Sequence, residues 1–233
     1  MDEKLFRSAS QMAEADNYSD WTCSLFERYL TGQVLEIGCG VGTFTRRILD
    51  RGKPERLLSI DVSADAIEYC RATISHPALE FQCVDARRIQ GEFDNIICMN
   101  VLEHIEDDQA ALEHILSLLK PGATLFLLVP AHRFLFTPFD VAGGHFRRYT
   151  KKYMRQLIRS VSNGSTFDLQ QCYFNIIGAI GYFISYRVLH KVPHAGAAAE
   201  IAFFDSFVVP VMRRIESRHM PFGISLVTIA SKK

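Results

Sequence analysis

The chain has 233 residues, and its 26 lysines and arginines balance 26 aspartates and glutamates, so the formal net charge is zero. Apolar residues make up 48% of the sequence, which suffices for the core of one α/β domain over residues 1–233. Because nucleic-acid-binding proteins usually carry a basic excess, we expect no nucleic-acid partner.

Cysteine usage and the apolar runs predict a cytoplasmic protein. The six cysteines stand singly, without a Cys-x-x-Cys pair, as is typical of reduced intracellular proteins. The first ten residues are charged and lack the apolar stretch of a signal peptide. The longest strongly apolar run, residues 176–184, is too short to span a bilayer.

Strand-like and helix-like segments alternate in the first half of the chain. Helical spacing predicts helices at 43–52, at 63–75 with Ser63 as N-cap, and from Asp107 or Asp108 to about Lys120. Apolar, β-prone stretches predict strands at 33–38, 56–61, 79–85, 93–100 and 123–131. This alternation is typical of βαβ units in a parallel sheet, which binds ligands beyond the carboxyl ends of its strands.

The second half of the chain is less regular. Residues 175–190 are apolar on nearly every face, so a helix there is expected to be buried or covered. Pro210 is expected to interrupt or bend a later helix. The remaining predicted elements are a helix at 151–161, a strand at 167–174, a loop at 195–200 and a closing strand, suited to a hairpin, at 223–230.

A glycine-rich loop follows the first predicted strand. The stretch VLEIGCGVGTF places Gly38, Gly40 and Gly42 between a strand and a helix, where glycine permits a sharp turn and close approach of a ligand. A dinucleotide fingerprint would need a glycine at Thr43, so a nicotinamide or flavin site is a poor match. The carboxylate of Glu36 at the strand end suits an ammonium or other cationic ligand better than a pyrophosphate.

Acidic residues follow the next two strands. Asp61 ends the second strand, 19 residues after Gly42, where a carboxylate can bind both hydroxyls of a ribose. Asp85 follows the third strand and can accept a hydrogen bond from an exocyclic amine. These positions predict a nucleoside site without a phosphate cradle.

Five stretches in register then resemble the class I S-adenosylmethionine-dependent methyltransferases, over about residues 30–131. They are VLEIGCGVG, LLSIDVS, CVDAR, FDNIICMNVLEHI and LKPGATLFLLVPA. The resemblance implies a Rossmann-like α/β fold, with seven strands in a mostly parallel sheet, the last antiparallel, and helices on both faces. It also implies S-adenosylmethionine as cofactor and a small-molecule methyl acceptor.

By this resemblance, the three glycines shape the loop beside the amino-acid part of the cofactor, and Glu36 helps to hold that loop. Asp61 would bind the ribose, Asp85 with Ala86 would meet the adenine, and the region of Asn100 would lie against the methionine part. The full set expected to contact the cofactor is Glu36, Gly38, Gly40, Gly42, Asp61, Val62, Asp85, Ala86, Asn100, Val101, His104 and Tyr18.

The word Leu-Glu-His-Ile occurs twice, at 102–105 and at 112–115. On a helical wheel the second copy directs His114 away from the apolar stripe, so we expect His114 in solvent. The first copy follows the fourth strand, where His104 would either line the pocket or order the loop. Metal ligands must converge to about 2 Å from the ion, and His104 and His114 point in different directions, so we predict no metal site.

The segment 130–150 is too long and too aromatic for a simple connection, which indicates a functional loop. Its GGHFRRYT resembles the pattern GH-x-RRYT of a bacterial type 11/12-like subgroup, and YFNIIGAIG and PFGISL extend that resemblance along the chain. His145 is our candidate general base, although it could instead order the loop. The residues expected on the acceptor side are His132, Asp140, Arg147, Arg148 and Tyr149.

Several alternatives stay open on the acceptor side. Arg147 and Arg148 would hold an anionic group of the acceptor or pair with Asp140 or Asp205, and Tyr149 suits packing better than catalysis. Residues 175–190 would roof the acceptor pocket, form a dimer face or rest peripherally on a membrane.

We therefore expect residues 33–131 to form the cofactor-binding core, 1–32 a covering helix, and 132–150 and 175–215 a cap. The predicted activity is transfer of a methyl group from S-adenosylmethionine to oxygen, nitrogen or carbon of a small, hydrophobic acceptor. The alternatives are another displacement at the same cofactor, such as aminopropyl transfer, and a non-catalytic cofactor-binding protein.

Overall fold

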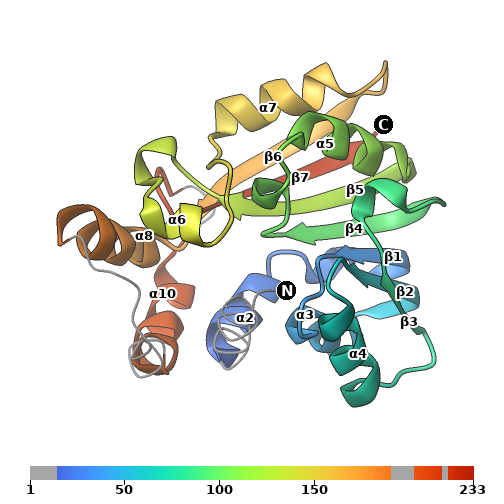
Figure 1. Cartoon of the computed structure of the whole chain (residues 1–233), viewed down its shortest axis with the longest axis horizontal. Helices are drawn as coiled ribbons and strands as arrows, with labels where there is room; N and C mark the ends of the chain where they lie inside the picture. Colours follow the sequence, from blue (N-terminus) through green and yellow to red (C-terminus); the bar gives the residue numbers. More distant parts are fainter. Residues whose placement is uncertain (1–14, 190–201, 217–219) are drawn as a thin grey trace.

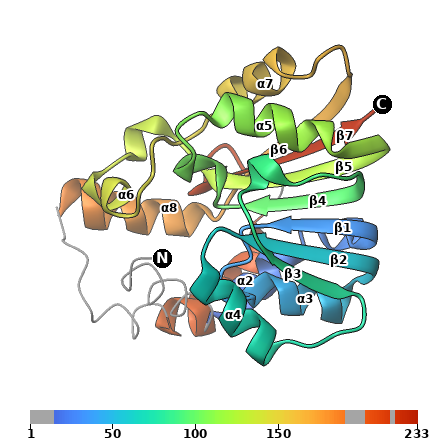
Figure 2. The ribbon, with the colours of Figure 1, turned by 45° about the vertical axis from the view of Figure 1, so that its right-hand side comes forward.

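The protein folds around one seven-stranded sheet with strand order β3-β2-β1-β4-β5-β7-β6 (Figures 1 and 2). The structure is a computed structural model that describes residues 15–189, 202–216 and 220–233, so the predicted loop at 195–200 lies outside the described residues. The strands are β1 (Thr31–Ile37), β2 (Lys53–Asp61), β3 (Leu79–Cys83), β4 (Phe93–Met99), β5 (Leu119–Pro130), β6 (Phe167–Phe174) and β7 (Ser225–Lys232).

The strand directions confirm the predicted fold class. The β1 strand pairs in parallel with β2 and β4, and β4 pairs in parallel with β5. The β7 strand is antiparallel to both of its neighbours, β5 and β6. The carboxyl ends of β1, β2 and β4 therefore meet at one edge, where the predicted ligand-binding residues lie.

Alternating side chains of the central strands supply the cores on the two faces of the sheet. In β5, Leu125 and Leu127 pack into a core with α5 (Asp108–Ser117) and α7 (Lys151–Ser160). Phe126 and Leu128 pack into the opposite core with α2 (Asp16–Cys23), α3 (Thr43–Arg51) and α10 (Val209–Ile215). Figure 1 shows α5 and α7 on one side of the sheet and α2 and α3 on the other. Burial on both faces explains why these strands are continuous apolar runs.

Two predicted helices differ from the structure at their ends. The helix expected to reach about Lys120 ends at Ser117, and β5 begins at Leu119, paired with Phe93. Proline disfavours a helical conformation in the residue before it, so Pro121 keeps Lys120 extended, and the Lys120 ammonium lies 3.0 Å from the Asp94 carboxylate. The helix at 63–75 is α4 (Ala64–Thr73), and the Ser63 hydroxyl accepts a hydrogen bond from its first turn, as predicted.

A cap lies beyond the carboxyl ends of β4 and β5, where α6 (Pro138–Ala142) and α8 (Ile176–Tyr182) lie side by side (Figures 1 and 2). The Tyr182 hydroxyl joins them, because it lies 2.6 Å from the Thr137 hydroxyl and 2.7 Å from the Asp140 carboxylate. The later described residues of the predicted cap insertion 175–215 are not part of this cap. The α10 helix, with Pro210 in the first turn, packs against the sheet beside α2.

The apolar segment 175–190 corrects one prediction. It is helical, continuing from α8 into a π-helical turn (Phe183–Val188), but it is not covered by the described residues. Ile184 and Val188 are 46% and 54% exposed. No helix among the described residues is both long and apolar enough to cross a membrane.

Candidate functional site

The glycine loop between β1 and α3 has a backbone that only glycine adopts without strain. Gly38, Gly40 and Gly42 have φ angles of +79°, +52° and +79°. A Cβ atom on Gly38 would lie 2.2 Å from the Val101 side chain, and one on Gly42 would lie 2.4 Å from Ile74. A Cβ atom on Gly40 would meet no other atom within 4 Å. The outer glycines therefore serve packing, whereas Gly40 leaves open space above the loop.

Asp61 fixes this loop to the end of β2. The Gly40 amide donates to Oδ2 of Asp61 at 2.9 Å, and the Ser63 amide donates to Oδ1 at 2.9 Å. The amides of Gly38 and Cys39 donate to the Ile60 carbonyl at 2.8 and 3.0 Å. Each carboxylate oxygen keeps a free lone pair, so Asp61 retains the capacity to accept hydrogen bonds from the two hydroxyls of a ribose.

Glu36 acts from inside the protein. Its carboxylate is buried and accepts hydrogen bonds from the hydroxyls of Thr45 and Ser59 at 2.6 and 2.7 Å. Burial raises the pKa of Glu36 to about 7, although both hydrogen bonds oppose this shift. The side chain thus ties α3 to β2 beneath the loop, as expected from the resemblance, and its burial contradicts the suggestion that it faces a cationic ligand.

Glu36→Gln is expected to remove a pH dependence of folding stability. The folded-state pKa lies above its ordinary value of 4.5, so the folded wild type holds an extra proton between pH 4.5 and 7 and loses stability as the pH rises through that window. By pH 8 the variant should have gained up to about 3 kcal/mol relative to wild type. Urea unfolding of both proteins from pH 4.5 to 8 measures this, and a pH-independent difference would contradict it.

Asp85 and its neighbours form the predicted adenine edge. Asp85 forms an ion pair with Arg87 at 2.5 Å, and the hydrogen bond from Arg87 lowers the pKa of Asp85 to about 2. Ala86 is buried and Val62 is exposed. An ionised Asp85 can only accept hydrogen bonds, which suits an exocyclic amine. The contacts of Asp85, Ala86 and Val62 with the cofactor stay predictions.

Two further predicted cofactor positions differ in their surroundings. Asn100 directly follows β4 and has a φ of +52°, an uncommon backbone for any residue but glycine. Tyr18 packs against Trp21 and Phe174, with ring centroids 6.4 and 5.9 Å away, and so lies beside the end of β6. A cofactor contact of Tyr18 stays a prediction.

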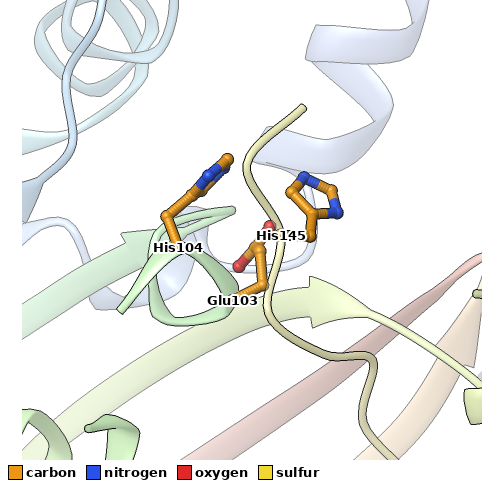
Figure 3. A group of neighbouring side chains, drawn as sticks. All are labelled: Glu103, His104 and His145. Carbon is orange, nitrogen blue, oxygen red and sulfur yellow. The ribbon is translucent and has the colours of Figure 1, made fainter. Parts of the chain in front are cut away.

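Two histidines and a glutamate meet where the loops after β4 and β5 touch. The Phe146 amide donates to the Glu103 carbonyl at 2.8 Å, which joins the two loops. The rings of His104 and His145 have centroids 4.6 Å apart and lie nearly perpendicular. Glu103 is 1% exposed, and its Oε2 atom is buried without a hydrogen-bond partner. Figure 3 shows the three side chains pointing toward one region.

Burial sets the protonation of this group. It raises the pKa of Glu103 to about 8, and burial together with the nearby His145 lowers the pKa of His104. Near neutral pH, His104 is therefore neutral and Glu103 is largely protonated while it has no cationic partner.

Asp140 of α6 organises the residues around His145. Its buried carboxylate accepts hydrogen bonds from Nδ1 of His145 at 3.1 Å, from Arg148 at 2.7 Å and from the Tyr182 hydroxyl at 2.7 Å. Burial opposes ionisation, but the hydrogen bond from His145 and the charge of Arg148 outweigh it, so the pKa of Asp140 lies below its usual range. An ionised carboxylate can only accept, so Nδ1 of His145 carries the proton and Nε2 is left free.

Sequence comparison identifies the domain that carries this geometry. The family model Methyltransf_12, described as a methyltransferase domain, matches residues 35–125, which include the glycine loop, Asp61, Asp85 and His104. Residues 35–125 therefore match a methyltransferase domain, in agreement with the resemblance found in the sequence.

Proteins of related sequence match about two fifths of this chain. The ubiquinone biosynthesis O-methyltransferase of Xanthomonas campestris is 33% identical over 101 residues, 41% of this chain and 41% of that protein. An uncharacterized protein of Synechococcus is 32% identical over 106 residues, 42% of this chain and 25% of that protein. The chain thus matches less than half the length of either relative.

Solved structures share the fold of the methyltransferase domain. The methyltransferase in complex with the Trm112 activator of Haloferax volcanii superposes with a TM-score of 0.60 at 20% identity, covering 85% of this chain and 81% of that chain. The N-methyltransferase NodS of Bradyrhizobium japonicum superposes with a TM-score of 0.52 at 17% identity, covering 100% of this chain and 99% of that chain.

Four residues predicted to contact the acceptor have partners within the protein. Asp140, Arg148 and Tyr149 are at most 4% exposed. Arg148 pairs with Asp140, and the Tyr149 hydroxyl donates to the Asp108 carboxylate at 3.0 Å. Arg147 also pairs with Asp108, at 3.0 Å. The pairing of Arg148 with Asp140 is the alternative that the sequence left open. A direct contact of these residues with an acceptor stays a prediction.

His132, the remaining acceptor-side candidate, lies in an aromatic cluster. Its ring centroid is 4.3 Å from that of Tyr173 and 4.4 Å from that of Phe222. Its φ angle is +62°, and its Nε2 atom is buried without a hydrogen-bond partner. A role toward the acceptor stays a prediction for His132.

The second Leu-Glu-His-Ile copy also needs a correction. His114 lies on α5, but it is half-buried, and its Nε2 atom lies 2.8 Å from the Ile89 carbonyl. The turn after Asp85 folds back over α5, so the ring that the helical wheel directs to solvent meets backbone.

Glu103 is the site residue that we did not predict as a contact. The sequence contained one indication of this contact. Glu103-His104 and Gly144-His145 each follow a strand of the same parallel sheet, so both are expected at the same edge of that sheet.

Proposed function

We propose that the protein transfers a methyl group from S-adenosylmethionine to an oxygen atom of a small, hydrophobic acceptor. The observation that carries this proposal is the left-handed glycine loop, which Asp61 pins at the carboxyl edge and which leaves open space at Gly40. Oxygen is favoured over nitrogen and carbon because relatives from Xanthomonas campestris and Coxiella burnetii are named ubiquinone biosynthesis O-methyltransferases.

The residues around the loop fit the cofactor. Asp61 would accept hydrogen bonds from the two ribose hydroxyls, and Gly40 would let the amino-acid part approach the backbone. Asp85 would accept a hydrogen bond from the adenine amine. Asn100 and Val101, at the end of β4, would lie against the methionine part.

The chain's own task is to place the acceptor and to take its proton. When bound, S-adenosylmethionine supplies an electrophilic methyl carbon, so that an oxygen–carbon bond forms as the carbon–sulfur bond breaks. Asp140 orients His145 with Nε2 free, and this nitrogen can take the proton that the acceptor hydroxyl loses. Histidine is the side chain that most often acts as a general base in enzymes.

The exposed side of the cap favours a hydrophobic acceptor. Ile180, Phe183 and Ile184 expose 39–46% of their surface along α8 and its π-helical extension. The ring of Phe139, on the neighbouring α6, is 38% exposed and lies 4.8 Å from that of Tyr186. We propose that these side chains receive the apolar part of the acceptor, either from solution or from a membrane surface on which this face rests peripherally.

Calorimetric titration with S-adenosylmethionine, followed by product analysis with phenols that bear apolar tails, tests this function. We expect micromolar binding, O-methylated products and S-adenosylhomocysteine. Absence of binding would overturn the cofactor assignment. Methylation of amines alone would overturn the assignment of oxygen, and an aminopropylated product would overturn methyl transfer.

A further inference from the structure

We propose that Glu103, His104 and His145 together bind a divalent metal ion on the acceptor side of the domain. One ligand atom from each residue lies within 4.8 Å of the other two. A four-coordinate zinc ion with bonds of about 2 Å spaces its ligand atoms about 3.3 Å apart, so the ligand atoms would have to approach one another by up to about 1.5 Å to bind the ion. Figure 3 shows the side chains converging.

The Glu103 carboxylate supplies an independent reason for a cation here. A buried carboxyl group normally finds hydrogen-bond partners, because leaving it unpaired costs free energy. Oε2 of Glu103 is buried and has none, although the residue is only 1% exposed. A metal ion between the two imidazole rings would satisfy this oxygen.

The surrounding groups hold both histidines as metal ligands are usually held. A metal-binding histidine generally donates its other ring N–H to a carboxylate or backbone group, which fixes the ring and frees one nitrogen. Nδ1 of His145 donates to the Asp140 carboxylate at 3.1 Å, and His104 forms a hydrogen bond with the backbone of Gly144. The Asp140–His145 pair thus leaves Nε2 of His145 free to act as a ligand.

The donor set points to the class of ion. Two imidazole nitrogens and one carboxylate oxygen favour zinc or another first-row divalent ion over magnesium, which prefers oxygen ligands alone. Three protein ligands leave at least one position open, as in catalytic rather than structural metal sites.

The metal's role rests on the proposed function, whereas its binding does not. An acceptor hydroxyl in the open position would be oriented by the ion and would become more acidic. With the metal bound, Nε2 of His145 would be a ligand and the proton would pass to water; without the metal, the same Nε2 could take the proton, as proposed above. The sequence-based prediction of no metal considered His104 with His114; the fold instead brings His145 to His104.

Titration of metal-free, untagged protein with Co²⁺ and Zn²⁺ tests the site, by visible absorption and by calorimetry. We expect one ion per chain, with the visible absorption bands of tetrahedral or five-coordinate cobalt. Glu103→Gln and His145→Ala should each weaken binding on the order of 100-fold. Glu113→Gln and His114→Ala, which alter the second Leu-Glu-His-Ile copy, are matched controls and should bind as wild type.

The outcomes separate the two proposals. Wild type that binds S-adenosylmethionine but none of Zn²⁺, Co²⁺, Mn²⁺ and Mg²⁺ would overturn the metal site alone. Equal affinities in the Glu103 variant, the His145 variant and wild type would also overturn it, because the ion would then lie elsewhere. Metal binding without S-adenosylmethionine binding would support the metal site and count against the proposed function. Circular dichroism of each metal-free variant verifies folding.

Discussion

Asp140→Ala is expected to lower the free energy of unfolding by about 3–5 kcal/mol, because it leaves a buried arginine without a counter-charge. Arg148 is 4% exposed and pairs with Asp140 at 2.7 Å. The same carboxylate accepts hydrogen bonds from the Thr137 amide and the Tyr182 hydroxyl at 2.8 and 2.7 Å. One substitution therefore removes the ion pair and loosens the contact between α6 and α8.

Urea unfolding measures this loss, and Asp168→Ala is its matched control. Asp168 is an exposed aspartate of β6, so its removal should change stability by less than about 0.5 kcal/mol. Adding Arg148→Met to Asp140→Ala should recover part of the loss, because the uncompensated charge is then also removed. A cost below about 1 kcal/mol for Asp140→Ala alone would contradict the assigned role.

Asp61→Ala is expected to weaken S-adenosylmethionine binding by about 100-fold or more. Hydrogen bonds to a charged group contribute about 1.5–3 kcal/mol each, and the proposed ribose contact involves two. The substitution also removes the acceptor for the Gly40 and Ser63 amides, so the loop would lose its fixed conformation. Calorimetric titration measures the affinity directly.

Glu68→Ala is the control for this second variant. Glu68 is an exposed acid on α4, close in sequence to Asp61, so its removal changes the net charge equally without touching the loop. We expect its cofactor affinity to match that of wild type. Similar weakening in both variants would mean that net charge, not the carboxylate at the end of β2, governs binding.

The cofactor side could be predicted from sequence because its determinants are local. Gly38, Gly40 and Gly42 lie within five residues, and their backbone requirements follow from the strand–turn–helix that contains them. Asp61 is placed by the end of its own strand. The parallel order of the strands then brings these residues to one edge, and this rule needs no knowledge of individual side-chain contacts.

The acceptor side was harder to predict because its polar residues choose partners only in the folded chain. From the sequence alone, Arg148 could equally have bound an anionic group of the acceptor. Its ion pair with Asp140 forms because α6 packs against α8 in the folded chain. The sequence does not indicate that Glu103 is buried, because charged residues are rarely buried. The loop around Phe146, which covers Glu103, also comes much later in the chain. Apolar residues on nearly every face likewise predicted a buried or covered helix at residues 175–190, although several of their apolar side chains are exposed.

The position of β7 has a consequence for how the chain assembles. Among the described strands, β6 pairs with β7 alone, and β7 lies between β5 and β6 although it comes last in sequence. During synthesis, β1 to β5 can associate before β7 is made, whereas β6 has no pairing partner until then. The two strands are about fifty residues apart in sequence, and pairing between such distant segments is slow. Since α8 follows directly from β6, the cap should be the last part of the protein to become protected from hydrogen exchange during refolding.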